Sequence, residues 1–317
     1  MKYQLFSYSA SSVEARTGML VLGKHFDLAL LAAILSEARL VRSIDQFLED
    51  WPSSHGLLKA CALQLASPDA ATLSAALAQD AIVFEPPLTR PGVIYAAGAN
   101  YRDHVEAMSR AFGMKLVLDP KAEGVDPWHF IKAGRGTLVG SGHDIAFPPH
   151  TEKLDWEAEL AVVIGTPASK VGIDRALLHV AGYTCANDLS ARDNLVRQKV
   201  DPTSPFRFDW IGHKCFTGAC PLGPYFTPAE FVGSPEDLDI QLRINGELKQ
   251  DSNTSNHLYG VADQISYLSE RLRLYPGDVI LTGTPAGVGM ETGTFLKRGD
   301  EVCVRIEGLG ELRNRIV

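Results

Sequence analysis

The stretch LDWEAELAVVIG (residues 154–165) ends in an apolar run, which predicts a strand buried on both faces. Side chains at positions i and i+2 of a strand point to the same face, so Glu157 and Glu159 would share a face, with Trp156 and Leu160 on the other. At about 6–7 Å and an effective dielectric near 20, two carboxylates repel by roughly 2–3 kcal/mol. The pattern therefore predicts either a cation between the acids or a face that is fully solvated.

A third acid occurs in a similar setting. The segment AGYTCANDLSARD (residues 181–193) carries Asp188 at the end of a strand-like run and Arg192 four residues later. Two glutamates and one aspartate form an all-oxygen ligand set, which suits Mg²⁺, Mn²⁺ or Ca²⁺. Zinc is less expected, because no cysteine or histidine has ligand spacing beside these acids. On the residues alone, an edge strand with a solvated polar face remains the alternative.

The pattern of residue types along the chain changes near residue 88. Ala/Leu-rich helical stretches follow two short strand-like runs in the first 85 residues, and EPPLTRPG (residues 85–92) then carries three prolines that favour an inter-domain connection. Short β-branched runs separated by glycine and proline dominate after it. We expect an α+β, mostly β chain with a small α/β N-terminal domain (residues 1–88) and a catalytic domain (residues 89–317).

The composition limits the classes of binding partner that are expected. The 317 residues carry a net charge of −8, and no Lys/Arg-rich run or membrane-spanning apolar stretch occurs, so neither a nucleic acid nor a membrane is expected as a partner. The start, MKYQLFSYSA, lacks the plan of a signal peptide, and the five cysteines form no CxxC spacing. We therefore expect reduced thiols and a cytoplasmic location. The absence of GxSxG and HExxH removes two hydrolase classes.

Five motifs together resemble the fumarylacetoacetate hydrolase family, over roughly residues 86–317, in the family's order. They are GANYRDHVEAM (98–108), LDWEAELAVVIG (154–165), YTCANDLSARD (183–193), HKCFTGACPLGP (213–224) and PGDVILTGTPAGVG (276–289). The resemblance implies a mixed β-roll or sandwich fold, usually dimeric, with a small leading domain as in many bacterial members. It also implies a divalent metal, most simply Mg²⁺, and small anionic keto-acid substrates from aromatic or sugar-acid catabolism.

Carried over position by position, the resemblance assigns roles to seven residues, and Glu106 and Tyr101 are added as further candidates. The metal ligands are Glu157, Glu159 and Asp188; the catalytic candidates are His104, Lys214 and Glu106; the substrate contacts are Arg192, Thr284 and Tyr101. His104 is expected to act as the general base on a lid-like segment. For Tyr101, packing in the core is the alternative.

Two departures from the family pattern affect the site. Many hydrolytic members carry a glutamate three residues after the motif histidine, where this chain has Ala107, and Glu106 stands one residue earlier. Leu195 replaces a glutamine that commonly follows the ARD motif. The segment at residues 198–212 is also unlike the commonest members and is expected to shape the pocket.

The sequence thus predicts a divalent-metal-dependent hydrolase that cleaves a C–C bond in a small acylpyruvate or 1,3-diketo acid through a metal-stabilised enolate. The alternative is a decarboxylase, isomerase or dehydratase of the same family that uses the same metal site. A non-catalytic binding protein is a third, weaker interpretation.

Overall fold

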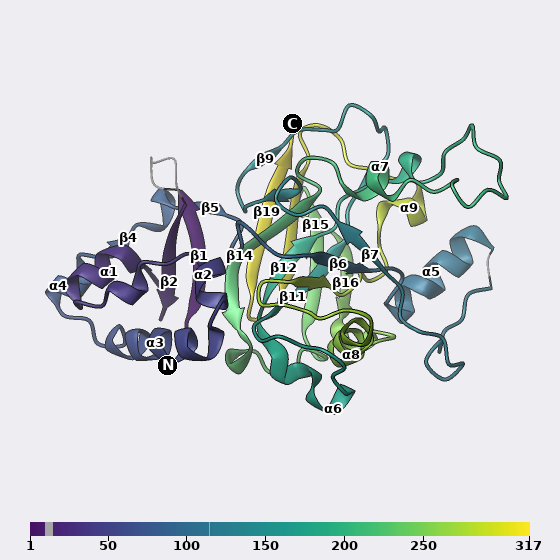
Figure 1. Cartoon of the computed structure of the whole chain (residues 1–317). Helices are drawn as coiled ribbons and strands as arrows, with labels where there is room; N and C mark the ends of the chain where they lie inside the picture. Colours follow the sequence, from purple (N-terminus) through teal and green to yellow (C-terminus); the bar gives the residue numbers. More distant parts are fainter. Residues whose placement is uncertain (10–14, 114) are drawn as a thin grey trace.

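The computed structural model describes residues 1–9, 15–113 and 115–317, and its strands form two main sheets (Figure 1). The larger runs in the order β4 (Ala76–Leu77), β3 (Lys24–Asp27), β2 (Arg16–Val21), β1 (Gln4–Ser9), β14 (Cys220–Pro228), β12 (Val180–Asn187), β11 (Ala158–Ile164), β17 (Val279–Leu281), β6 (Ile94–Ala97) and β7 (His129–Lys132). Beside this path, β5 (Val83–Glu85) pairs with β1 and β8 (Leu138–Val139) with β14.

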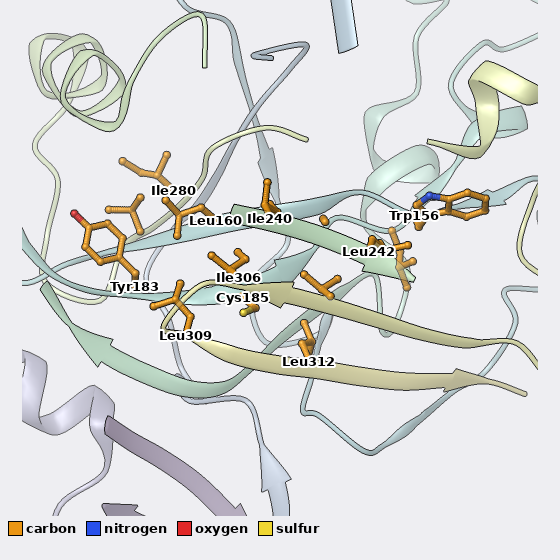
Figure 2. Close-up of a cluster of buried hydrophobic side chains, with 14 of the residues drawn as sticks. Trp156, Leu160, Tyr183, Cys185, Ile240, Leu242, Ile280, Ile306, Leu309 and Leu312 are labelled. Carbon is orange, nitrogen blue, oxygen red and sulfur yellow. The ribbon is translucent and has the colours of Figure 1, made fainter. Parts of the chain in front are cut away.

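The second sheet packs on one face of the first. Its order is β16 (Glu247–Asn253), β15 (Asp239–Ile244), β18 (Glu301–Ile306), β19 (Gly310–Ile316) and β9 (Asp144–Ile145). A separate two-stranded ladder joins β10 (Leu154–Asp155) to β13 (Ser190–Ala191). Figure 2 shows Leu160 and Tyr183 of the large sheet meeting Ile240, Ile306 and Leu312 of the second, all buried. The mostly-strand α+β architecture expected from the sequence is the one the chain adopts.

Successive side chains along β11 and just before it point to opposite faces of the large sheet, as predicted. Trp156, Ala158 and Leu160 lie in the core between the sheets, whereas Ala161 and Val163 belong to the core on the opposite face. Glu159 points to the same face as Ala161 and Val163, because it is separated from them by an even number of residues, and it pairs with Ala186 of β12. The acidic residues therefore lie on the face of the large sheet that turns away from the sandwich core.

The helices cover the ends and edges of the sheets. They are α1 (Leu28–Ile34), α2 (Ile44–Leu48), α3 (Trp51–Gln64), α4 (Ala70–Leu73), α5 (Arg102–Phe112), α6 (Ile173–Ala176), α7 (Trp210–Lys214), α8 (Val261–Arg271) and α9 (Gly289–Thr292). Figure 1 shows α1–α4 at one end of the molecule and α5, α7 and α9 at the other. In the described residues, none of the helices combines the length and the apolar character that crossing a bilayer requires.

The N-terminal strands join the large sheet instead of forming a sheet of their own. Leu5 of β1 pairs with Phe226 of β14, and both side chains are fully buried in one cluster with residues of β11 and β17. All five cysteines are free thiols, as expected, and four of them are buried.

Candidate metal centre and substrate cavity

Three buried carboxylates converge at one end of the large sheet. Glu157 lies between β10 and β11, Glu159 lies in β11, and Asp188 follows β12; one carboxylate oxygen from each lies within 4.8 Å of the others. Strand β11 begins at Ala158, so Glu157 lies just before the strand and not inside it as the sequence pattern predicted. The backbone N–H of Glu157 donates to the Asn187 side chain (2.9 Å), while its carbonyl accepts from the N–H of Asp188 (2.8 Å). These bonds hold the two ligand segments together.

Two lysines surround Asp188. Lys214 Nζ donates to Glu157 Oε2 (2.7 Å) and Asp188 Oδ2 (2.6 Å), and Lys132 Nζ donates to Asp188 Oδ1 (2.5 Å). Both ammonium groups are buried. Burial alone would raise the pKa of Glu157, but the cations of Lys214 and Arg192 outweigh it and bring that pKa far below its usual range. Two of the three acids therefore have cationic partners within the protein.

Glu159 is the acid whose charge lacks such compensation. Its Oε2 accepts from the backbone N–H of Gly283 (2.6 Å), and its buried Oε1 has no hydrogen-bond partner in the part of the chain that the structure describes. Burial, and then the charges of Asp188 and Glu157, raise the pKa of Glu159 well above its usual range. A buried carboxylate oxygen without a partner is costly, and a hard divalent cation would satisfy it. The residues present thus fit a divalent metal.

Arg192 holds the acids in position and faces the substrate cavity. Its Nε donates to Asp155 Oδ2 (2.7 Å) and its Nη2 to Glu157 Oε1 (2.5 Å). Asp155 in turn accepts from the backbone N–H of Gly289 at the start of α9 (2.7 Å). The remaining nitrogen, Nη1, has no hydrogen bond to any residue that the structure describes, which leaves it available to an anionic ligand.

His104 is paired with an acid that the sequence did not suggest. Its Nδ1 lies 2.7 Å from Glu291 Oε1, and Glu291 Oε2 accepts from the backbone N–H of Gly287 (2.8 Å). A carboxylate only accepts, so Nδ1 carries the proton and Nε2 is free to act as a base. Glu106 does not reach this pair; its carboxylate lies 3.9 Å from Arg110. Positions i and i+2 of a helix do not face each other, which explains why Glu106 turns away from His104.

The two remaining candidates lie in different surroundings. Thr284 lines the cavity, and its hydroxyl oxygen accepts from Gln250 Nε2 (2.8 Å), so its own proton is free to donate. Tyr101 is fully buried, packs its ring against His257 at 4.5 Å between centroids, and does not line the cavity. Burial raises the pKa of the Tyr101 hydroxyl, which has no partner within the described residues. The geometry thus fits packing better than substrate contact for Tyr101.

A cavity of about 350 Å³ opens onto this group. Its lining combines five of the predicted residues with apolar and aromatic side chains: Ala97, Gly98, Ala99, His104, Met108, Trp128, Phe130, Glu157, Arg192, Leu195, Trp210, His213, Lys214 and Thr284. A wider surface hollow of about 990 Å³ lies between the N-terminal segment and the loop at Pro276, and its lining includes none of the candidate site residues. The smaller cavity is therefore the candidate substrate site.

Two residues of this site were missed in the sequence. Lys132 is the buried last residue of strand β7, whose other residues are partly buried or exposed, so the local sequence carries little signal for its buried ion pair with Asp188. Glu291 follows the PAGVGM segment, and the only indication was indirect, since Ala107 leaves His104 without its usual acid.

Buried carboxylates that could hold a divalent metal, neighbouring cations and a histidine–carboxylate pair beside one cavity are the features of a metal-dependent enzyme site. The family model described as fumarylacetoacetate (FAA) hydrolase C-terminal matches residues 93–317, and the chain belongs to this family. The fold and the resemblance expected from the sequence are therefore confirmed.

Named relatives carry out several reactions. The chain is 39% identical over 238 residues to the mitochondrial oxaloacetate tautomerase FAHD2B of Homo sapiens, covering 74% of this chain and 70% of that protein. It is 38% identical over 233 residues to 2,4-didehydro-3-deoxy-L-rhamnonate hydrolase of Sphingomonas sp. (strain SKA58), covering 73% and 75%. Membership of this family therefore identifies the class of enzyme and does not by itself identify the reaction.

Solved structures of similar fold agree with this family assignment. A probable 2-hydroxyhepta-2,4-diene-1,7-dioate isomerase from Mycobacterium abscessus superposes with a TM-score of 0.75 at 26% identity, covering 100% of this chain and 98% of that one. Fumarylpyruvate hydrolase from Pseudomonas aeruginosa, solved with Mn²⁺ and pyruvate, gives a TM-score of 0.60 at 32% identity, covering 74% and 91%.

Proposed function

We propose that this enzyme is a divalent-metal-dependent hydrolase that cleaves a C–C bond in a small acylpyruvate or 1,3-diketo acid. One observation carries the proposal: the unpartnered oxygen of Glu159 belongs to a carboxylate cluster whose Glu157 lines the same cavity as His104, the partner of Glu291. The metal-and-pyruvate complex of the Pseudomonas relative supports the same class of ligand.

In this mechanism Glu157, Glu159 and Asp188 would hold the ion, which when bound would supply Lewis-acid chemistry to a keto acid. Arg192 Nη1 and the Thr284 hydroxyl bind the substrate carboxylate. His104 Nε2 removes a proton from water, and Glu291 stabilises the imidazolium that forms.

The resulting hydroxide adds to the distal carbonyl carbon of the substrate. The bond from that carbon to the adjacent methylene breaks, and its electron pair stays with the pyruvate part as an enolate. His104 then returns its proton to the enolate carbon. The products are a carboxylic acid and pyruvate, so one water is consumed and no redox partner is needed.

A keto-acid tautomerase or decarboxylase is the second candidate, because a relative at 39% identity is named as an oxaloacetate tautomerase. The His104–Glu291 pair would then move a proton on substrate carbon without activating water. Only the fate of the substrate separates the two reactions.

The test uses metal-free protein to which Mg²⁺ or Mn²⁺ is added back. Acetylpyruvate should yield pyruvate in the presence of metal and none after EDTA. Tautomer exchange of oxaloacetate without cleavage of acetylpyruvate would favour the tautomerase, and CO₂ release from oxaloacetate would favour the decarboxylase. Turnover that survives chelation would contradict every version of the proposal.

Three finer features complete the proposal. Mg²⁺ is the proposed ion because the ligand set is all oxygen, with Mn²⁺ or Ca²⁺ as substitutes. A cytoplasmic location fits the five free thiols. A homodimer is proposed from the family resemblance, and its mass in solution by light scattering tests it.

A further inference from the structure

The cavity lining divides into a charged part and an aromatic part. Glu157, Arg192 and Lys214 are joined by direct hydrogen bonds. Phe130 begins the aromatic part, with its ring centroid 5.2 Å from Lys214 Nζ. A substrate whose carboxylate and keto group occupy the charged part must therefore direct its remaining substituent along aromatic side chains.

Three rings form a continuous aromatic wall. The Phe130 ring stacks on Trp210 with centroids 5.2 Å apart, and Trp210 lies 4.9 Å from Trp128. Trp128 is 48% exposed and therefore lies toward the opening of the cavity. Leu195 and Met108 add apolar lining. Aromatic and aliphatic surface of this kind binds an apolar ring well.

The position of this wall is fixed by the backbone. The N–H of Gly98 donates to the Trp128 carbonyl (3.1 Å), and the Trp128 ring lies so close that a Cβ on Gly98 would meet it at 2.2 Å. The Asp209 side chain accepts from the N–H of Gly212 (2.8 Å) and caps α7, whose first residue is Trp210. A tryptophan held in this way and left half exposed indicates a contact surface.

The aromatic part offers no unpaired cation to a second carboxylate among the described lining residues. Lys214 lies beside Phe130 but is already paired with Glu157 and Asp188, and His213 lies 5.7 Å from the Trp210 ring. Burial, and then Lys214 and Arg192, lower the pKa of His213 to about 3, so its imidazole is neutral. Arg207, on the loop that precedes α7, is not among the lining residues, and its Nη1 donates to the Pro202 carbonyl (2.8 Å). A distal carboxylate would lose hydration here without gaining a counter-charge.

We propose that the substrate of this enzyme carries an aromatic ring, or an apolar group of similar bulk, on its distal side, and not a second carboxylate. This inference rests on the proposed function, because it uses the keto-acid end to orient the ligand. It separates the chain from the fumarylpyruvate-type ligand named for its Pseudomonas relative.

Binding to metal-loaded protein tests the inference independently of turnover. Calorimetric titrations would use pyruvate, phenylpyruvate and 2-oxoglutarate, which share the keto-acid end and differ in the distal group. Phenylpyruvate should bind about tenfold or more tightly than pyruvate, and 2-oxoglutarate no more tightly than pyruvate. Affinity for 2-oxoglutarate equal to or above that for phenylpyruvate would overturn the inference.

Variants locate the effect on the wall. Trp210→Ala should lower phenylpyruvate affinity toward that of pyruvate, and Trp128→Ala gives a second test at a half-exposed position. Leu195→Arg should raise 2-oxoglutarate affinity severalfold, because it supplies the missing cation. Phe206→Ala is the matched control, since Phe206 is 73% exposed on the loop that precedes α7 and does not line the cavity. Equal loss of phenylpyruvate affinity in Phe206→Ala and Trp210→Ala would also overturn the inference.

Turnover then separates this inference from the proposed hydrolase. Benzoylpyruvate should be cleaved with a higher kcat/KM than acetylpyruvate. If neither compound is cleaved but phenylpyruvate binds as expected, the hydrolase is wrong and the aromatic ligand class stands. If acetylpyruvate is cleaved and aromatic compounds neither bind nor react better, the hydrolase stands and the ligand class is wrong.

Discussion

Glu291 determines which nitrogen of His104 is available to a substrate or water. The carboxylate holds Nδ1 at 2.7 Å and is itself fixed by the Gly287 N–H. Without it, the imidazole could turn or adopt the other tautomer, and Nε2 would lose its orientation. The single residues of this site therefore depend on partners that lie far away in the sequence.

Glu291→Ala should lower kcat on the order of 10²-fold with a smaller change in KM, because the acid acts on the base and does not touch the substrate. Adding Ala107→Glu should restore part of kcat, since position 107 lies one helical turn from His104. Steady-state kinetics of the single and double variants measure both effects. Glu106→Ala should matter much less, and the reverse ranking of Glu106 and Glu291 would contradict this pairing.

Asp188 and Glu159 should respond differently to neutralisation. Asp188→Asn leaves the buried ammonium group of Lys132 without a carboxylate partner, a type of change that costs about 3–5 kcal/mol, and leaves Lys214 with Glu157 alone. Glu159→Gln removes crowding among like charges and should leave the metal-free protein as stable or more stable. Both variants should lose the rise in Tm that Mg²⁺ or Mn²⁺ produces. A Glu159→Gln protein that metal still stabilises would exclude Glu159 as a ligand.

Among the structural elements, α5 carries the base and is fastened at its first turn. Asp103 Oδ2 accepts from the Ser252 hydroxyl of β16 (2.6 Å), and Oδ1 accepts from the N–H of Ala286 (3.3 Å) and from its own helix (2.7 Å). One side chain thus joins α5 to the second sheet and to the segment that precedes α9. The position of His104 is set by this connection as well as by Glu291.

Asp103→Ala should lower kcat/KM roughly tenfold while leaving metal affinity unchanged, because the helix loosens but the acids at the sheet end stay in place. Ser252→Ala removes one of these bonds and should have a smaller effect. Kinetics together with a metal titration measure the two quantities separately. A parallel loss of metal affinity would show that α5 supports the centre itself.

Elements with a simple period could be predicted, and contacts between distant elements could not. The alternation along β11 placed Glu159 on the face opposite Leu160, because side-chain direction in a strand follows from sequence alone. Contact between His104 and Glu291 joins positions 187 apart, and no local pattern encodes it. Tyr101 lies within a functional motif, yet its side chain enters the core, since membership of a motif does not fix the direction of a side chain.

At the scale of the whole molecule, buried histidines link stability to pH. Burial lowers the pKa of His129 to about 4, below the value of about 6.5 expected in an unfolded chain. Between these values the unfolded state binds the proton and the native state does not, so stability falls as the pH drops from about 6.5 toward 4.

His129→Phe should remove this contribution, which is at most about 1.4 kcal/mol per pH unit for one proton. Urea unfolding at pH 7 and pH 5 gives the free energy of unfolding that each protein loses between the two pH values. The difference between the loss in the unsubstituted protein and the loss in His129→Phe is the contribution of His129. The lost contact with Gln264 (3.2 Å) adds a cost that does not depend on pH and therefore cancels. Equal losses in the two proteins would show that His129 titrates normally.

The first 88 residues were predicted as a separate domain, and their packing suggests a unit that does not unfold alone. Trp51 of α3 meets Phe226 of β14 edge to face at 5.3 Å, and Leu5 pairs with the same phenylalanine across the sheet. A chain that starts at Val93 would expose Phe226 and leave the β14 edge that faces β1 without its partner, a hazard for aggregation.

We expect full-length protein to unfold in urea in one transition by both fluorescence and circular dichroism, and the shortened chain to be insoluble or to unfold at much lower urea. Leu5→Asp in the full chain tests the same contact without deletion and should lower the urea midpoint, whereas Leu22→Asp, at a position 69% exposed, should not. Two separate transitions in the full chain, or a stable and active shortened chain, would mean that residues 89–317 need nothing from the N-terminal strands.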